Sequence, residues 1–230
     1  QRALAEIGDP LGMGEIGCFC PPSTSVVSGT DPRNGKPYVN QLFLGHTAGG
    51  AVAYQDAWMT MLHAGNGGMC FIDSVELDEV YTPIVVKTRR LIPDSEGAGR
   101  FRGAPGIEVE LGPVDCRMEA GFVADGNFNI PKGARGGGSA ARSDQFRRKR
   151  DGTLERLAQC SQVWIEDGEM LLSIACGGGG YGDPKSRDPK RVQQDVKEGI
   201  LSRKRARRIY GVAIKPNGAI DEQRTKELRT

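Results

Sequence analysis

The chain has 230 residues, and its 31 Lys and Arg against 29 Asp and Glu give a net charge of +2, which argues neither for nor against a nucleic-acid partner. Hydrophobic residues make up 38% and charged residues 26%, the balance of a globular chain large enough to bury a core. No apolar run reaches the roughly 18–20 residues that span a bilayer, and the first residues do not show the basic-then-apolar pattern expected of a signal peptide.

The first forty residues mix one helical fragment with turns and a strand. Residues 1–7 (QRALAEI) are typical of the end of a helix that stops at Gly8, so the chain is expected to begin inside an element. Residues 21–33 are rich in turn formers. Residues 36–44 (KPYVNQLFL) then predict a strand, and residues 52–63 are ambiguous in period.

The middle of the chain predicts β structure. Residues 106–111 (GIEVEL) alternate apolar and charged side chains, which indicates a half-buried strand. Residues 146–157 predict a hairpin around Asp151-Gly152. Further strands are expected at 82–91 and, on either side of a turn at 166–168, at 163–165 and 169–174.

Three short helices are predicted after residue 187. Asp188 is a typical N-cap, Pro189 fits the first helical position and Gly199 follows the end. Ser202 caps a second helix that stops at Gly211, and Asp221 caps a last one over 222–229. We therefore expect an α+β chain, with a glycine-rich, mostly antiparallel β body at 1–186 and a helical tail at 187–230.

The two histidines, His46 and His63, lie in or beside glycine-rich loops at 45–50 and 65–68. A histidine in such a loop can act as a general acid or base or bind a metal, and it can also be an ordinary hydrogen-bonded surface residue. Asp73, Glu76, Asp78 and Glu79 form an acidic cluster nearby, which indicates either acid–base chemistry, foremost at Glu76, or a solvated face.

Other motifs favour structural interpretations. The irregular spacing of the six cysteines favours reduced thiols and a cytoplasmic protein, and Cys18 and Cys20 have no second pair to complete a zinc site. Gly177–Gly180 fits a close-packed turn better than a phosphate loop. Residues 132–138 (KGARGGG) fit either a flexible turn or an anion site. The basic run Arg203–Arg208 favours a solvated helix or a subunit contact over nucleic-acid binding.

Three ordered stretches carry a family resemblance: residues 90–106 (RLIPDSEGAGRFRGAPG), residues 177–184 (GGGGYGDP) and the tail with RIYGV and DEQRTKELR. They resemble the C-terminal portion of the hydantoinase B/oxoprolinase family, over most of residues 82–230. The family's subunits are longer, and nothing in this chain matches their His- and Asp-rich N-terminal half.

The resemblance implies part of a multi-subunit enzyme that uses ATP to hydrolyse a cyclic amide (a hydantoin, oxoproline or a lactam) or to carboxylate a ketone. It implies ATP and Mg at a hydantoinase A-like partner, a divalent metal, Zn or Mn, in the N-terminal half of the subunit, and no cofactor within this chain. The expected partners are that N-terminal half, the ATP-binding subunit and a small-molecule substrate, with no nucleic acid and no membrane.

The family loop before its acidic segment corresponds here to residues 61–83, which makes His63, Asn66 and Glu76, with His46, the expected catalytic residues. That loop and residues 129–138 depart from the family pattern, which leaves the substrate open. The alternative is a non-catalytic scaffold that supports the catalytic half and the ATP-binding subunit.

Overall fold

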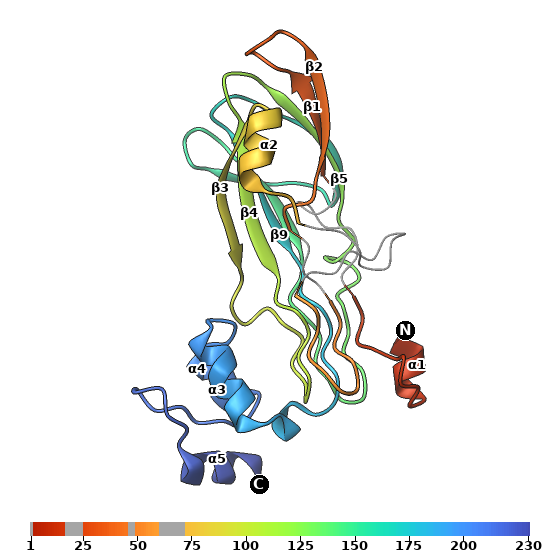
Figure 1. The fold of residues 1–230 in the computed structure, drawn as a ribbon, viewed down its shortest axis with the longest axis vertical. Coiled ribbons are helices and arrows are strands. Elements are labelled where there is room, and N and C mark those ends of the chain that lie inside the picture. Colours follow the sequence, from red (N-terminus) through yellow and green to blue (C-terminus); the bar gives the residue numbers. More distant parts are fainter. Residues whose placement is uncertain (1, 17–24, 46–48, 60–71) are drawn as a thin grey trace.

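The computed structural model describes residues 2–16, 25–45, 49–59 and 72–230. Its body consists of two sheets in which every strand pairs antiparallel with its neighbours (Figure 1). The first sheet has the order β2-β1-β5-β8, with β1 at Ser25–Thr30, β2 at Pro37–Leu42, β5 at Met118–Val123 and β8 at Cys160–Ile165. The second has the order β3-β4-β9-β6-β7, with β3 at Ile84–Leu91, β4 at Ile107–Pro113, β9 at Met170–Ala175, β6 at Asp144–Arg148 and β7 at Leu154–Arg156.

One core joins the two sheets. Val27, Met118 and Phe122 from the first sheet share a buried cluster with Val109 and Leu171 from the second. Alternate residues of β5 are buried, as expected for a strand with one face on a core. In β4 nearly every residue is buried, so the strand predicted at residues 106–111 is confirmed but its half-buried character is wrong. Helix α2 (Val75–Tyr81) packs beside β3 on the outside of the body.

Below the sheets, extended glycine-rich segments run side by side (Figure 1). Residues 178–180 lie among them, and each donates its backbone N–H to a carbonyl of a different segment. Gly178 donates to Ala104 O at 2.9 Å, Gly179 to Glu15 O at 2.8 Å and Gly180 to Gly138 O at 3.1 Å. These three residues therefore connect three separate segments of the chain.

Glycine is required here because the backbones touch. A Cβ on Gly103 would lie 1.9 Å from Gly178 O, and one on Gly179 would lie 2.1 Å from Lys132 O. The prediction that Gly177–Gly180 forms a turn is therefore wrong, although the expected close packing is confirmed. Periodicity could not reveal this arrangement, because glycine has no side chain to display a buried face.

The C-terminal helices follow their predicted caps. A short 3-10 helix at Pro184–Ser186 leads into α3 (Pro189–Lys197), α4 (Arg203–Arg208) and α5 (Glu222–Arg229), whose N-caps are Asp188, Ser202 and Asp221. A second apolar cluster, built on Val192, Leu201 and Tyr210, holds them together and includes Ala98 of the body. No helix in the described part of the chain is long and apolar enough to cross a membrane.

The structure confirms the α+β class, the helices and most predicted strands, and two further segments differ from the expectation. Residues 25–30 form β1, although 21–33 were expected to be turns, because Val27 is buried while the polar residues around it pair with β2 and β5. Residues 75–81 form α2, capped by Ser74, where only a polar segment was expected. The short helix α1 (Arg2–Glu6) ends before Gly8, whose φ is 84°, as expected.

Candidate functional site

Three of the four expected catalytic residues, His46, His63 and Asn66, lie outside the described residues. The fourth, Glu76, is exposed in the first turn of α2, and its Oε2 accepts a hydrogen bond from Ser74 Oγ at 2.6 Å. That hydrogen bond lowers the pKa of Glu76 below its ordinary value. Glu76 is therefore ionised at neutral pH, which suits it as a base or an anionic partner and not as an acid.

Two other carboxylates of the acidic cluster bond to backbone. Asp73 Oδ2 accepts from Phe43 N at 2.5 Å, which joins the start of α2 to the end of β2. Glu79 Oε1 accepts from Val86 N at 2.8 Å, next to the irregularity in β3 between Val86 and Thr88. These two residues act as local structural ties.

Asp78 differs from the rest of the cluster. Its side chain is only 7% exposed; Oδ1 accepts a hydrogen bond from Asn40 Nδ2 at 3.3 Å, and the buried Oδ2 has no hydrogen-bond partner among the described residues. Burial, reinforced by the charge of Asp73, raises the pKa of Asp78 to about 6. Asp78, and not Glu76, is thus the carboxyl of this cluster that changes charge just below neutral pH.

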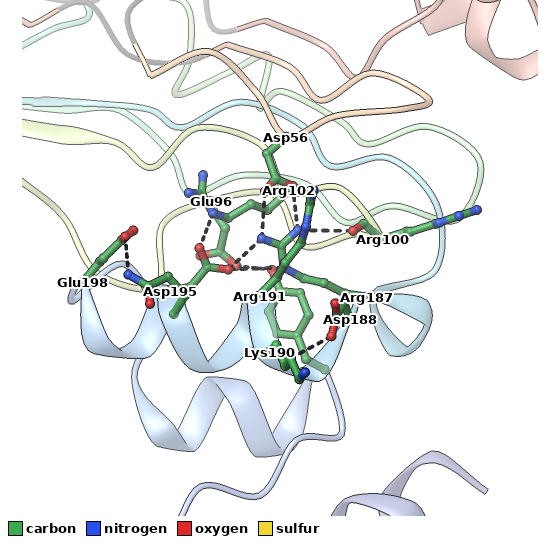
Figure 2. Close-up of polar contacts among 12 residues, drawn as sticks. Asp56, Glu96, Arg100, Arg102, Arg187, Asp188, Lys190, Arg191, Asp195 and Glu198 are labelled. Atoms are coloured by element: carbon green, nitrogen blue, oxygen red, sulfur yellow. Dashed lines mark hydrogen bonds and ion pairs between the residues drawn. The ribbon is translucent and has the colours of Figure 1, made fainter. Parts of the chain in front are cut away.

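A second polar group, centred on Arg187, lies between the glycine-rich segments and α3 (Figure 2). Arg187 is 1% exposed, and its Nη1 and Nη2 donate to the two oxygens of Asp56 at 2.6 and 2.8 Å. Its Nη2 also donates to Asp195 Oδ2 at 2.8 Å. Arg102 completes the group by donating from Nε to Asp195 Oδ1 at 2.8 Å and from its backbone N to Asp56 Oδ1 at 2.8 Å.

The Arg187 network joins two buried arginines to two aspartates, and Arg191 adds a longer ion pair of 3.7 Å to Asp56. Burial alone would raise the pKa of Asp56, but the hydrogen bonds and charge of Arg187 hold it below its ordinary value. Burial would likewise lower the pKa of Arg187, and Asp56 and Asp195 outweigh that effect and raise it. Asp56 and Arg187 are therefore both charged at neutral pH, and the network connects residues 56–59 to the tail.

Glu96 makes a second, smaller connection between the body and the C-terminal tail. Its side chain is fully buried, and Oε1 accepts hydrogen bonds from Arg205 Nε at 2.8 Å and Tyr210 OH at 2.9 Å. Burial raises the pKa of Glu96, although the charge of Arg205 opposes the rise. The sequence pointed to neither connection, because their members are far apart along the chain and belong to no catalytic motif.

The glycine-rich segments offer little to a phosphate, and the described residues offer little to a metal ion. The N–H groups of Gly178, Gly179 and Gly180 donate to protein carbonyls, so they form no phosphate cradle. In residues 132–138, Lys132 N donates to Glu15 and Gly138 N to Ala98, which removes donors from the expected anion site. Within the described ranges, no group of three His, Cys, Asp or Glu side chains could hold a metal ion.

Comparison with known proteins gives a consistent result. The sequence model of the hydantoinase B/oxoprolinase family matches residues 4–184. A caprolactamase subunit beta from Pseudomonas jessenii is 32% identical over 209 residues, which are 88% of this chain and 36% of that protein. An acetophenone carboxylase delta subunit from Aromatoleum aromaticum is 42% identical over 65 residues, 27% of this chain and 10% of that protein.

The fold is also shared with a solved structure. The crystal structure of ATP-dependent caprolactamase from Pseudomonas jessenii superposes with a TM-score of 0.74 and 27% identity over 94% of this chain and 38% of that one. The chain thus spans somewhat more than a third of the caprolactamase relatives that it matches.

Proposed function

The chain belongs to the hydantoinase B/oxoprolinase family, and on that premise we propose that it is part of the B-type subunit of an ATP-dependent complex that opens a cyclic amide. The observation that supports this most is the 32% identity to a caprolactamase subunit beta over 88% of the chain. In the proposed reaction one water opens the ring, its hydroxyl going to the carbonyl carbon and its proton to the nitrogen as the C–N bond breaks. A second water is consumed overall as the γ-phosphoryl group of ATP is released as phosphate and ADP is left.

The nucleotide and the metal are proposed to bind outside this chain. ATP with Mg would sit on a hydantoinase A-like subunit, and Zn or Mn in the N-terminal half of this subunit type. The described residues fit neither group, since they hold no cluster of three metal ligands and the glycine N–H groups of residues 178–180 are bonded to protein. This chain would contribute proton transfer and substrate positioning.

We propose His63, Asn66, Glu76 and His46 as the catalytic residues of this chain. His63 would move the proton that the ring nitrogen requires, because a histidine is poised to do so near neutral pH. Glu76 supports the set through its exposed, ionised carboxylate at the start of α2. Asp73 and Glu79, which bond to backbone, are proposed to hold α2 in place.

Exposed apolar side chains on α2 support a large interface with other polypeptide. Leu77, Val80 and Tyr81 are 56%, 62% and 74% exposed, and adjacent apolar residues of this kind mark protein contacts. We propose that the N-terminal half of the subunit covers this face. A cytoplasmic location is also proposed; the free thiols of Cys116 and Cys160 fit a reducing compartment.

The test is turnover of the assembled complex, purified through a tag on this chain. With ATP and a panel of caprolactam, 5-oxoproline and hydantoin, we expect ADP and a ring-opened amino acid in equal amounts. A complex that turns over none of these amides would contradict the proposal.

Ketone carboxylation is the second candidate, favoured by the 42% identity over 65 residues to an acetophenone carboxylase delta subunit. It is distinguished by its co-substrate: ATP hydrolysis would then require both bicarbonate and a ketone, and labelled bicarbonate would enter the product. A scaffold role would be indicated by unchanged turnover when His63 and Glu76 are both replaced.

A further inference from the structure

A groove with uncompensated positive charge runs along the C-terminal helices. A cavity of about 760 Å³ lies between α4, α5 and residues 211–214, and six of its ten lining residues are basic. These are Lys185, Arg203, Lys204, Arg207, Arg208 and Arg224. None of the described residues that line it carries a carboxylate, and Ala213, Ile214 and Leu228 supply an apolar floor.

A second cavity of about 700 Å³ continues the groove. It shares Arg203 and Ile214 with the first cavity and adds Lys197 together with the amides of Gln193 and Asn217. Together the two cavities, here called the basic groove, exceed the 300–1,000 Å³ that is usual for a single small-molecule pocket. Figure 1 shows α3, α4 and α5 grouped at one end of the molecule, away from the sheets.

Most of the charge in the basic groove is unpaired. Arg224 pairs with Glu227 at 2.8 Å, and Arg203 Nη2 donates to Pro216 O at 2.9 Å. The other four cations of the first cavity, Lys185, Lys204, Arg207 and Arg208, have no ion-pair partner among the residues that the structure describes.

This arrangement costs stability within the chain itself. Arg203 and Arg207 are four residues apart on α4, as are Lys204 and Arg208, and like charges at that spacing repel. Arg203 and Lys204 also lie in the first turn of α4, where the helix dipole disfavours cations. An anionic partner would relieve both effects.

We propose that the basic groove binds an acidic segment of a partner polypeptide, with apolar side chains on its floor. The length of the groove and its apolar floor favour a polypeptide over an isolated phosphate group. Within the described parts of the chain no aromatic ring lines either cavity, so the base stacking typical of single-stranded nucleic-acid sites has no support there. The inference rests on the proposed function only in that it supposes a partner polypeptide.

The test uses the full 230-residue chain and a fluorescent peptide of alternating Glu and Leu, with a Gln–Leu peptide as the uncharged comparison. Anisotropy is measured at low and physiological salt. In the variant K204E/R207E/R208E we expect the affinity for the acidic peptide to fall about tenfold or more, since three exposed charge contacts are reversed. The neutral variant K204Q/R207Q/R208Q should show a smaller loss and guards against misfolding by charge reversal.

The matched control is K36E/K87E/R142E, which changes the net charge equally at exposed positions of the β body. It should bind the peptide nearly as well as the unmodified chain. Equal weakening in both triple variants would overturn the proposal, as would the absence of any binding. Tighter binding of inorganic triphosphate or of a single-stranded oligonucleotide, lost in the groove variant, would also overturn it. Because no turnover is measured, the result is independent of the proposed reaction.

Discussion

Arg187 Nη1 and Nη2 donate hydrogen bonds of 2.6 and 2.8 Å to the two carboxylate oxygens of Asp56, although the two residues are 131 positions apart in the sequence. Asp56 lies between the expected catalytic residues His46 and His63 along the chain, while Arg187 directly precedes Asp188, the N-cap of α3. The contact therefore links the C-terminal tail to the part of the sequence in which catalytic residues are predicted. Because both groups are charged and Arg187 is buried, each depends on the other to remain in place.

Replacing Arg187 with Met should lower the free energy of unfolding by about 3–5 kcal/mol, because Asp56 and the buried Asp195 would lose their main partner. Denaturant titration measures the change. Arg90→Met breaks the exposed pair with Glu108 and should change stability by less than about 1 kcal/mol. Similar losses in the two variants would show that the Arg187 network is no more important than a surface ion pair.

Asp78→Asn should remove a pH dependence of stability. The pKa of Asp78 is raised to about 6 in the folded chain, against about 3.9 for an unfolded aspartate. The folded state therefore holds the proton more tightly, so Asp78 favours folding most below about pH 4, and that contribution is lost as the pH rises to about 6. The free energy of unfolding of Asp78→Asn relative to the unmodified chain should rise by about 1–3 kcal/mol over this range.

Asp151→Asn is the matched control for this measurement. Asp151 accepts a hydrogen bond from Thr153 N, which lowers its pKa, so its contribution to folding is lost only as the pH falls towards acid values. A stability difference for Asp78→Asn that stays constant from pH 4 to 7 would contradict the raised pKa.

Gly103→Ala should destabilise the chain by about 1–3 kcal/mol or prevent folding, because the added Cβ would lie 1.9 Å from Gly178 O and both sides of the contact are backbone. Gly121→Ala in β5 is the control. The nearest atom to a Cβ there is Val26 O at 3.9 Å, so stability should be unchanged or slightly improved. Thermal unfolding of the two variants compares them directly, and equal midpoints would refute the close packing of the glycine segments.

His63→Ala should lower turnover of the assembled complex about 10²-fold if His63 transfers a proton. Unfolding of the isolated variant should resemble that of the unmodified chain, which separates a catalytic effect from a folding effect. Glu76→Gln removes an ionised carboxylate that is exposed, so it provides a second catalytic variant with little structural cost. Full turnover in both variants would favour the scaffold role.

The sequence by itself determined the elements that depend on local physics. The caps at Asp188, Ser202 and Asp221 satisfy N–H groups within three residues, so the tail helices could be predicted from short patterns. The alternation of apolar and charged side chains in residues 107–111 similarly predicted a strand, which forms part of β4. The ordered motifs also predicted membership of the hydantoinase B/oxoprolinase family, which the family match over residues 4–184 confirms.

The tertiary structure decided what depends on distant residues. Whether a carboxyl of the acidic cluster is exposed, like Glu76, or buried with one unbonded oxygen, like Asp78, depends on the strand against which α2 packs. The glycines of residues 178–180 likewise depend on distant residues, because their N–H groups donate to three separate segments of the chain. Arg187 contacts Asp56 only in the folded chain, since the two residues are far apart in the sequence. Burial and hydrogen-bond partners determine the charge state of a side chain and how it packs. The spacing of residues along the chain does not specify either burial or partners, because both depend on the tertiary structure.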